Sequence, residues 1–241
     1  MENAVYTGLS RAIALQRDMD TLANNIANMN TPGFRAQYMM YTEEIEKQKG
    51  MSDPLSMVLD YGQWMSNKPG SMQLTENPTD AALQGPGFFG IQGPGGETMY
   101  TRSGNFAVNV KGDLVSAEGN PILNDGGAPI VIPADTTEIH IAEDGTISNQ
   151  DGQIARLMVK EFDNINDLDP VGDNMYKTTA EAKNATKTRV MQGLLEGSNV
   201  NPVLEMTHMI DVHRAYQNVQ RMLQSENERQ RTMIQRLTRG G

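Results

Sequence analysis

The chain has 241 residues, enough for one or two domains with a sizeable core, and it contains 38% hydrophobic but only 5% aromatic residues. It has 17 methionines and no cysteine, which excludes disulfides, thiolate metal sites and cysteine nucleophiles. The formal net charge of −10 lies in residues 51–195, where nine Lys/Arg face nineteen Asp/Glu, and such an acidic surface disfavours binding to nucleic acid or anionic lipid.

The first predicted element is an amphipathic N-terminal helix within residues 1–33. Apolar residues recur along it at steps of three and four, which is the period of a helix with one buried face. Thr31, Pro32 and Gly33 are typical of a helix stop. The unusual feature is a set of poor helix formers close to that stop, which are neither core leucines nor surface charges: Asn24, Asn25 and Asn28.

Two segments of different character follow the helix. Residues 41–75 show neither a helical nor a strand period clearly, and the segment 34–75 is predicted to form an extended connector. Residues 76–190 predict a central antiparallel β domain, because short alternating apolar runs are separated by Gly- and Pro-rich turns. The pattern that starts at Phe106 recurs 33 residues later at Ile139, as strand, turn, strand and turn. Two copies indicate a duplicated hairpin unit rather than a solenoid, with chance similarity of turn-rich sequence as the alternative.

Residues 191–241 are predicted to form the C-terminal helical segment. Asn201 followed by Pro202 is typical of an N-cap with proline at the first helical position. From Met206 a 3-4 spacing of apolar and amide residues continues without Pro or Gly until Gly240, which predicts a helix of about 55 Å. The chain is therefore expected to be an α+β protein, in which two long terminal helices pair as a coiled-coil-like base for the central β domain.

No catalytic or metal-binding constellation stands out in the sequence. Residues 85–90 spell G-x-G-x-x-G, but strand and turn residues follow and Pro86 removes a backbone donor, so a dinucleotide site is not expected. The histidines His140, His208 and His213 lack the i, i+4 spacing of a zinc pair and are interpreted as structural. We expect no cofactor, no metal and no enzymatic activity. The alternatives are a cell-wall hydrolase that uses paired carboxylates of the β domain, and a soluble binding module with a helical hairpin base.

Several blocks of sequence resemble bacterial flagellar axial proteins, the group that forms the rod, the hook and the hook-associated parts of the flagellum. Residues 22–35, LANNIANMNTPGFR, resemble the N-terminal signature of that family, and residues 193–201, GLLEGSNVN, resemble its C-terminal signature. Between them, residues 85–89 and 100–106 resemble the β domain shared by rod and hook subunits. Within the family the chain is most similar to proximal rod proteins, because its β domain carries no added second domain. Distal rod proteins are the close alternative.

The resemblance implies a structural subunit of the flagellar basal-body rod, which transmits torque across the periplasm. It implies assembly with copies of itself and with other proximal and distal rod proteins, and export through the flagellar type III apparatus without a cleaved signal peptide. The first 25 residues lack the continuous apolar core of an ordinary signal peptide. Neither nucleic-acid binding nor direct membrane insertion is expected, since no run of 18 apolar residues is present.

The candidate assembly interface consists of amide and apolar residues of the two terminal segments. Neutral amides both donate and accept hydrogen bonds, so they can be satisfied in a packed contact between subunits. The expected interface residues are Leu22, Asn24, Asn25, Ile26, Asn28, Asn30, Gly33, Phe34, Ser198, Asn199, Asn201, Met206, Ile210, Tyr216, Gln220 and Leu223.

Overall fold

The computed structural model describes residues 2–46 and 55–239, and the chain divides into two compact units. Unit 1 combines Met1–Ala27, Gln37–Trp64 and Asn201–Gly241, whereas unit 2 combines Asn28–Ala36 and Met65–Val200. The chain therefore passes between the two units four times. Each unit is built from segments that are far apart in the sequence, so both depend on long-range contacts.

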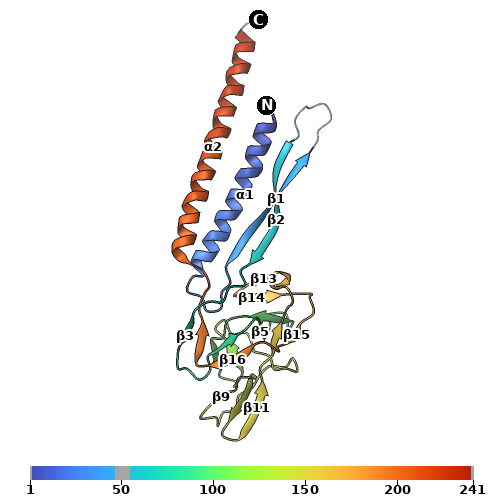
Figure 1. The fold of residues 1–241 in the computed structure, drawn as a ribbon, viewed down its shortest axis with the longest axis vertical. Helices are drawn as coiled ribbons and strands as arrows, with labels where there is room; N and C mark the ends of the chain where they lie inside the picture. The colour runs from blue at the N-terminus through green and yellow to red at the C-terminus, as the bar shows by residue number, and fades with distance from the viewer. Residues whose placement is uncertain (1, 47–54, 240–241) are drawn as a thin grey trace. The chain divides into compact units, whose positions relative to one another are not determined.

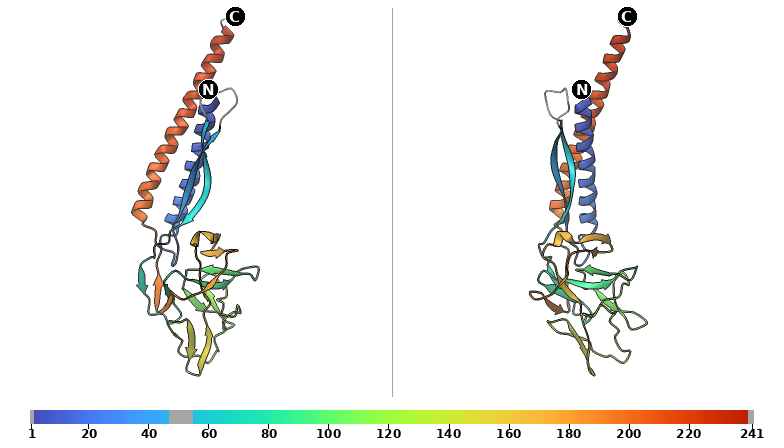
Figure 2. Two further views of the ribbon diagram at one scale, coloured as in Figure 1. Left: turned by 45° about the vertical axis from the view of Figure 1, so that its right-hand side comes forward. Right: turned by 90° about the vertical axis from the view of Figure 1, so that its right-hand side faces the viewer.

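Unit 1 contains two helices and a pair of strands. α1 (Glu2–Ala27) and α2 (Pro202–Arg239) pack side by side, and β1 (Gln37–Glu46) pairs with β2 (Leu55–Met65) next to α1 (Figures 1 and 2). At 1.5 Å per residue the helices are about 39 Å and about 57 Å long. Much of the segment 34–75, expected as an extended connector, is thus paired sheet. Pairing satisfies backbone groups that an isolated extended chain would leave to solvent.

The two helices run antiparallel and approach closely at small residues. Asn25, near the end of α1, hydrogen-bonds Glu205, near the start of α2. At the other end of the contact, a Cβ placed on Gly8 would lie 2.8 Å from the methyl carbon of Met222. The buried side chains of α2 recur at a seven-residue step, as on the contact face of paired helices: Glu205, Val212 and Val219.

The predicted apolar stripe of the C-terminal helix lies beside this contact face. Met206 and Ile210 are 49% and 52% exposed, although both belong to the predicted stripe. On α1, Leu9 and Ile13 are likewise about half exposed, at 50% and 48%. A helix with apolar residues on two faces can bury only one of them against a single partner helix. Unit 1 therefore retains an exposed apolar face.

Unit 2 is the antiparallel β domain. Its largest sheet has the strand order β13-β14-β6-β5-β12-β15, and smaller sheets contain β11-β10-β9, β16-β4, β17-β3 and β7-β8. The strands of unit 2 are β3 (Met72–Leu74), β4 (Ala81–Gln84), β5 (Phe88–Gln92), β6 (Thr98–Thr101), β7 (Phe106–Val108), β8 (Leu114–Ser116), β9 (His140–Ile141), β10 (Thr146–Asn149), β11 (Gly152–Arg156), β12 (Val159–Glu161), β13 (Asp169–Gly172), β14 (Met175–Lys177), β15 (Lys183–Asn184), β16 (Arg189–Gln192) and β17 (Leu194–Glu196), with a short 3-10 helix, η1 (Ile165–Asp167).

The segment 191–200, expected as part of the C-terminal helical segment, belongs to unit 2. It contains the end of β16 and all of β17, which pair antiparallel with β4 and β3. The helix begins only at Pro202, where the side-chain oxygen of Asn201 accepts hydrogen bonds from the N–H groups of Val203 (3.2 Å) and Leu204 (3.3 Å). The predicted N-cap is confirmed, and it explains why the helix starts there.

Two apolar clusters form the core of unit 2, and adjacent residues of β5 contribute to different ones. Phe89 belongs to the larger cluster and stacks edge-to-face on Phe106 at 5.0 Å. Phe88 belongs to the smaller cluster, with edge-to-face contacts to Phe162 and Tyr176. Successive side chains of a strand point to opposite faces, so the Phe-Phe pair of residues 85–90 is strand and turn, as predicted.

The predicted internal repeat is visible in the strand register. Gly112 and Gly145 occupy equivalent turn positions, with φ of 90° and 85°, where a side chain would be strained. Their N–H groups donate to the carbonyl three residues earlier, at 3.0 and 2.9 Å. The pairing of β7 with β8 maps onto that of β9 with β10 at an offset of 33: Val108↔Leu114 onto Ile141↔Ile147.

Candidate assembly interface

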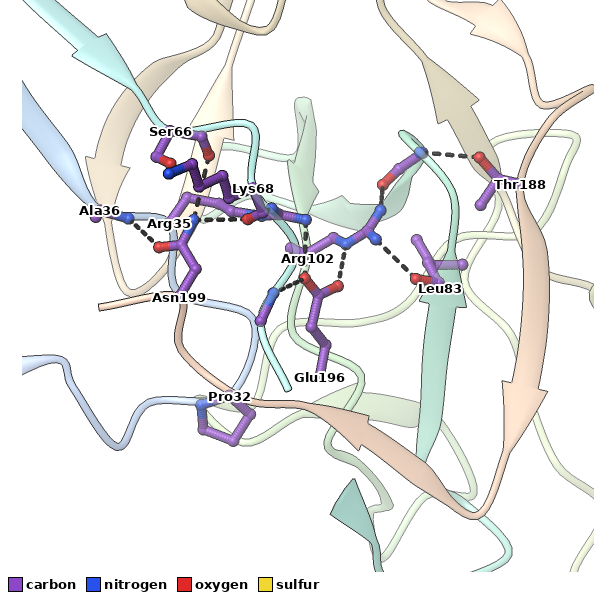
Figure 3. A network of polar contacts seen from close by, with 12 residues as sticks. Pro32, Arg35, Ala36, Ser66, Lys68, Leu83, Arg102, Thr188, Glu196 and Asn199 are labelled. Atoms are coloured by element: carbon purple, nitrogen blue, oxygen red, sulfur yellow. Dashed lines mark hydrogen bonds and ion pairs between the residues drawn. The ribbon is translucent and has the colours of Figure 1, made fainter. Parts of the chain in front are cut away.

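Unit 2 contains a buried cluster of one glutamate and two arginines (Figure 3). The Glu196 carboxylate lies 2.8 Å from Nη2 of Arg35 and 2.6 Å from Nε of Arg102, and all three side chains are at most 6% exposed. The N–H of Gly70 donates to the same carboxylate at 2.9 Å. Burial lowers the pKa of Arg35, an effect that the Glu196 charge opposes. Buried charges of this kind are stable only when paired, so each member depends on the others.

The remaining guanidinium donors of the cluster reach backbone carbonyls. Arg102 donates to the carbonyl of Leu83 at 2.7 Å and to that of Gly87, and Arg35 donates to the carbonyl of Lys68. Arg102 is 2% exposed, so these bonds replace the water that the guanidinium loses on burial. The cluster therefore connects β17 to β4 through Leu83 and to the segments that contain Lys68, Gly70 and Gly87.

Asn199 forms hydrogen bonds to segments of unit 2 that lie next to the points where the chain passes between the two units. Its Oδ1 accepts the N–H of Ala36 at 2.7 Å, and its Nδ2 donates to the carbonyl of Lys68 at 2.8 Å. Ser66 donates its N–H to the carbonyl of Ala36 at 2.9 Å (Figure 3 shows these residues together). Ala36, Ser66 and Asn199 each lie within two residues of a crossing between the units. One amide side chain thus fixes three chain crossings in one place.

Gly33 and Phe34 of the N-terminal signature are buried inside unit 2. Gly33 has φ of 69°, and its N–H donates to the carbonyl of Glu196 at 2.7 Å. A Cβ at this position would lie 2.5 Å from the backbone nitrogen of Ser103, so a side chain cannot be accommodated without backbone movement. Phe34 is 6% exposed. Both residues therefore have roles within the fold.

Asn25 plays a comparable part in unit 1. Its side chain is fully buried, and its amide both accepts from the N–H of Gln37 (3.0 Å) and donates to the carbonyl of Gln37 (2.8 Å). It thereby pairs with the first residue of β1 as a neighbouring strand would. Nδ2 also lies 3.3 Å from Glu205, whose carboxylate accepts the Tyr38 hydroxyl at 3.0 Å. Burial and this hydrogen bond raise the pKa of Tyr38 to about 12.

An apolar groove of about 770 Å³ lies between α1 and α2. Its apolar lining comes from Met19 and Ala23 of α1 and from Met206, Met209, Ile210 and Tyr216 of α2. Asp20 and Gln16 of α1 and His213 of α2 add polar groups to the lining. The structure thus brings three of the predicted interface residues, Met206, Ile210 and Tyr216, into one surface feature.

The other predicted interface residues differ in their exposure. Leu22 is buried in unit 1, Asn24 and Asn30 are exposed, and Ile26, Asn28, Ser198, Gln220 and Leu223 are half-buried. Asn28 accepts the Thr31 hydroxyl at 3.1 Å, and Gln220 donates to the Tyr216 hydroxyl at 3.0 Å.

Sequence reasoning missed the charged residues that organise both polar clusters. Arg35, Glu196 and Glu205 lie within or next to the quoted signatures, but no role was assigned to them. The one local signal is a glutamate directly after Leu194 and Leu195 in a strand. A charge in such a position needs a buried partner, whose identity the sequence does not reveal.

A second cavity, of about 390 Å³, lies in unit 2 and is lined by charged residues including Glu143, Asp144 and Arg189. A hydrolase would need a carboxylic acid there with a raised pKa. Hydrogen bonds from Thr146 instead lower the pKa of Asp144. Across residues 2–46 and 55–239, no group of three or more His, Asp or Glu side chains is arranged to hold a metal ion. Among the helices of the same residues, none has the length and apolar character needed to cross a membrane.

Comparisons with known proteins agree with this architecture. Three family models match consecutive parts of the chain: flagella basal body rod protein (residues 5–35), flagellar hook protein FlgE/F/G D1 domain (82–149), and flagellar basal body rod FlgEFG protein C-terminal (191–236). The first lies over α1 and the buried Gly33–Phe34 region, and the third over β17 and α2.

Curated relatives cover almost the whole chain. The flagellar basal-body rod protein FlgF of Caulobacter vibrioides is 38% identical over 242 residues, which is 98% of both chains. FlgF of Salmonella typhimurium is 33% identical over 95% of both chains, and the rod protein FlgG of Caulobacter vibrioides is 32% identical over 89% of this chain and 91% of its own.

The chain belongs to the flagellar basal-body rod protein family, as a structural subunit of the rod. Within that family it is of the FlgF, proximal-rod type, which its relatives support better than the FlgG type.

Proposed function

We propose that the subunit joins the rod through the exposed apolar face of unit 1, together with other rod proteins and copies of itself. The paired terminal helices act as a coiled-coil-like base in this contact. The role is mechanical rather than catalytic: the assembled helices transmit torque across the periplasm. The subunit reaches the rod through the flagellar export apparatus, without a cleaved signal peptide.

The observation that carries the proposal is the amount of apolar side chain left exposed on the helices. Tyr6, Leu9 and Ile13, at a 3-4 spacing on α1, are 58%, 50% and 48% exposed. Met206 and Ile210 on α2 are 49% and 52% exposed. An exposed apolar patch that follows one face of a helix is typical of a protein–protein contact.

The predicted amide residues contribute to this role in two different ways. Asn25 and Asn199 act indirectly, because they hold the helices, β1 and the chain crossings in place. Asn24 and Asn30 lie on or just after α1 and are exposed, so they can add polar contacts at the edge of the interface.

Leu9→Glu and Ile13→Glu test the proposal in a motile host whose own gene is replaced. A charge in the apolar contact should block rod assembly and motility, while circular dichroism shows a folded protein. The matched control is Val131→Glu in unit 2, where an exposed apolar residue (53%) is changed in the same way. Normal motility of both helix variants would refute the proposal.

A further inference from the structure

α2 extends beyond α1, and its last turns have no helix of unit 1 beside them (Figure 1). Gly8 of α1 is level with Met222 and Leu223 of α2. Since α1 begins at Glu2, six residues before Gly8, the antiparallel alignment ends near residue 229 of α2. The remaining ten residues of α2, up to Arg239, form about 15 Å of helix beyond this point.

This helix end is both apolar and basic. Met233 and Ile234 are 44% and 61% exposed. Between residues 227 and 236 the charged residues are Glu228, Arg229, Arg231 and Arg236, a net charge of 3 − 1 = +2. Glu226, just before them, pairs with Arg229 at 2.6 Å. The surface therefore combines adjacent apolar side chains with flanking guanidinium groups, which suits a partner with an apolar floor and carboxylates at its edge.

The groove between α1 and α2 has the complementary character. Its floor is formed by methionines, which adapt their shape to a partner, and by Ile210 and Tyr216. Asp20 places a carboxylate in the lining, which complements the guanidinium groups of the helix end. The groove therefore favours a basic apolar helix over an acidic one.

The helix end cannot fill the groove of its own chain. α2 is continuous from Pro202 to Arg239, and Ile234 lies 24 residues after Ile210, about 36 Å away along the axis. The occupant must come from another molecule. We propose that the groove receives a basic amphipathic helix end from an adjoining rod subunit, of the chemistry that the last turns of α2 themselves present. The inference rests on the proposed function, because it names the partner of the same apolar face.

The full-length protein and a fluorescently labelled peptide of residues 226–241 test the chemistry of the groove directly. The peptide should bind saturably, and Asp20→Lys in the protein should weaken binding at least tenfold at low ionic strength. A peptide with Arg229, Arg231 and Arg236 changed to glutamate should bind the original protein poorly and the Asp20→Lys variant better. The matched control, Asp125→Lys in unit 2, should leave peptide binding unchanged.

Cross-linking locates the contact. Because the chain has no cysteine, Ala23→Cys places a single thiol in the groove, and a peptide carrying Met233→Cys should form a disulfide with it under mild oxidation. Val110→Cys, an exposed site in unit 2, is the control and should remain uncross-linked. Equal binding of a scrambled peptide of the same composition, insensitivity to Asp20→Lys, or equal cross-linking at both cysteines would overturn the inference.

The outcome is separable from that of the proposed function. If Leu9→Glu blocks rod assembly but the peptide does not bind the groove, the apolar face of α1 is used in assembly without a basic helix end in the groove, and only the further inference fails. If the peptide binds the groove but Leu9→Glu and Ile13→Glu leave motility intact, the groove accepts a basic helix while the proposed use of the α1 face is refuted.

Discussion

At the scale of single residues, Glu196 is notable because its carboxylate is buried between two arginines of unit 2. Its carboxylate pairs with Arg35 and Arg102 at once, and neither arginine has enough exposure to recover full hydration. Its own backbone carbonyl accepts the N–H of Gly33, so the N-terminal signature and the end of β17 are joined by backbone and side chain together.

Glu196→Gln should therefore destabilise unit 2 strongly, because it leaves two buried guanidinium groups without a counter-charge. We expect a loss of about 3–5 kcal/mol in the free energy of unfolding, measured by urea denaturation. The exposed pair of Glu143 with Arg189 (3.1 Å) provides the control, since Glu143→Gln should cost at most about 1 kcal/mol. Similar losses in the two variants would contradict the role assigned to burial.

Because of Tyr176, the stability of unit 2 should decrease as the pH rises through the alkaline range. Burial raises its pKa from 10.0 to about 12, so the folded state keeps the phenol proton that the unfolded state loses. The associated stability is fully present below pH 10 and is lost as the pH rises to 12, by about 2–3 kcal/mol in total. Tyr176→Phe should remove this part of the pH dependence in urea titrations at pH 9, 10 and 11. An unchanged slope would argue against a late-titrating Tyr176.

Comparing Gly33→Ala with Gly119→Ala distinguishes the cost of backbone strain from the cost of a steric clash. Gly33 and Gly119 both have positive φ, 69° and 90°, but only Gly33 faces neighbouring backbone, whereas an added Cβ on Gly119 meets nothing within 4 Å. Gly119→Ala should cost about 1–2 kcal/mol from strain alone, and Gly33→Ala should cost about 2–5 kcal/mol because the steric clash is added. Thermal melting of both variants measures the difference, which should vanish if space is not limiting.

At the scale of elements, α1, β1 and α2 are held together by polar contacts as well as by apolar packing. Asn25 contacts both of its partner elements, and Glu205 links α2 to Tyr38 of β1. The ring of Tyr38 also stacks on Trp64, at 5.0 Å between ring centroids. A leucine in place of Asn25 would fill the space but leave the hydrogen-bonding groups of Gln37 unsatisfied.

Asn25→Leu should accordingly destabilise unit 1 by about 2–3 kcal/mol, because buried unsatisfied groups are costly. Asn24→Leu, at an exposed position of the same helix, should change stability by less than about 0.5 kcal/mol. Hydrogen exchange of α1 and β1 distinguishes the two variants. If Asn25→Leu exchanges like the original protein, the amide does not organise this contact.

The elements that sequence could predict are those set by neighbouring residues. Local hydrogen bonds and turn geometry determine the N-cap at Asn201, the end of α1 and the repeated hairpins. Asn, Pro and Gly favour these conformations, so their positions in the sequence predict them. The polar clusters depend on pairs far apart, such as Asn25 with Glu205, 180 residues away, and Arg102 with Glu196, 94 residues away. No periodicity specifies such pairs, so the sequence indicated the amides but not their partners.

The sequence also left open which face of α2 packs within unit 1. Apolar residues at a 3-4 spacing occupy more than one face, and the stripe through Met206 and Ile210 is the more continuous in sequence. In the structure Val212 and Val219 are the buried valines of α2, and Gly8 of α1 lies next to Met222 and Leu223. The choice of face thus depends on the partner helix as much as on the helix itself.

At the scale of the whole molecule, the two units have separate cores. Leu22 is 1% exposed in unit 1, and Phe89 is fully buried in unit 2. Leu22→Ala should lower the protection of α1 and α2 in hydrogen-exchange mass spectrometry, and Phe89→Ala should lower that of β5 and β6, by about 2–5 kcal/mol each. Equal losses across the whole chain in either variant would show that the units unfold as one.

The interleaving of the units also governs how the fold can form and vary. α1 pairs with α2, and nearly all of unit 2 lies between these two helices in the chain. Contacts between residues so far apart in sequence form slowly, so we expect the helical pair of unit 1 to form late in folding. The entropy of closing that loop grows only slowly with its length, by about 0.6 kcal/mol for each doubling. The segment between β2 and α2 can therefore lengthen or shorten during evolution at little thermodynamic cost to the helical pair. Change in this family is expected to concentrate there, while the chain crossings around Asn199 stay fixed.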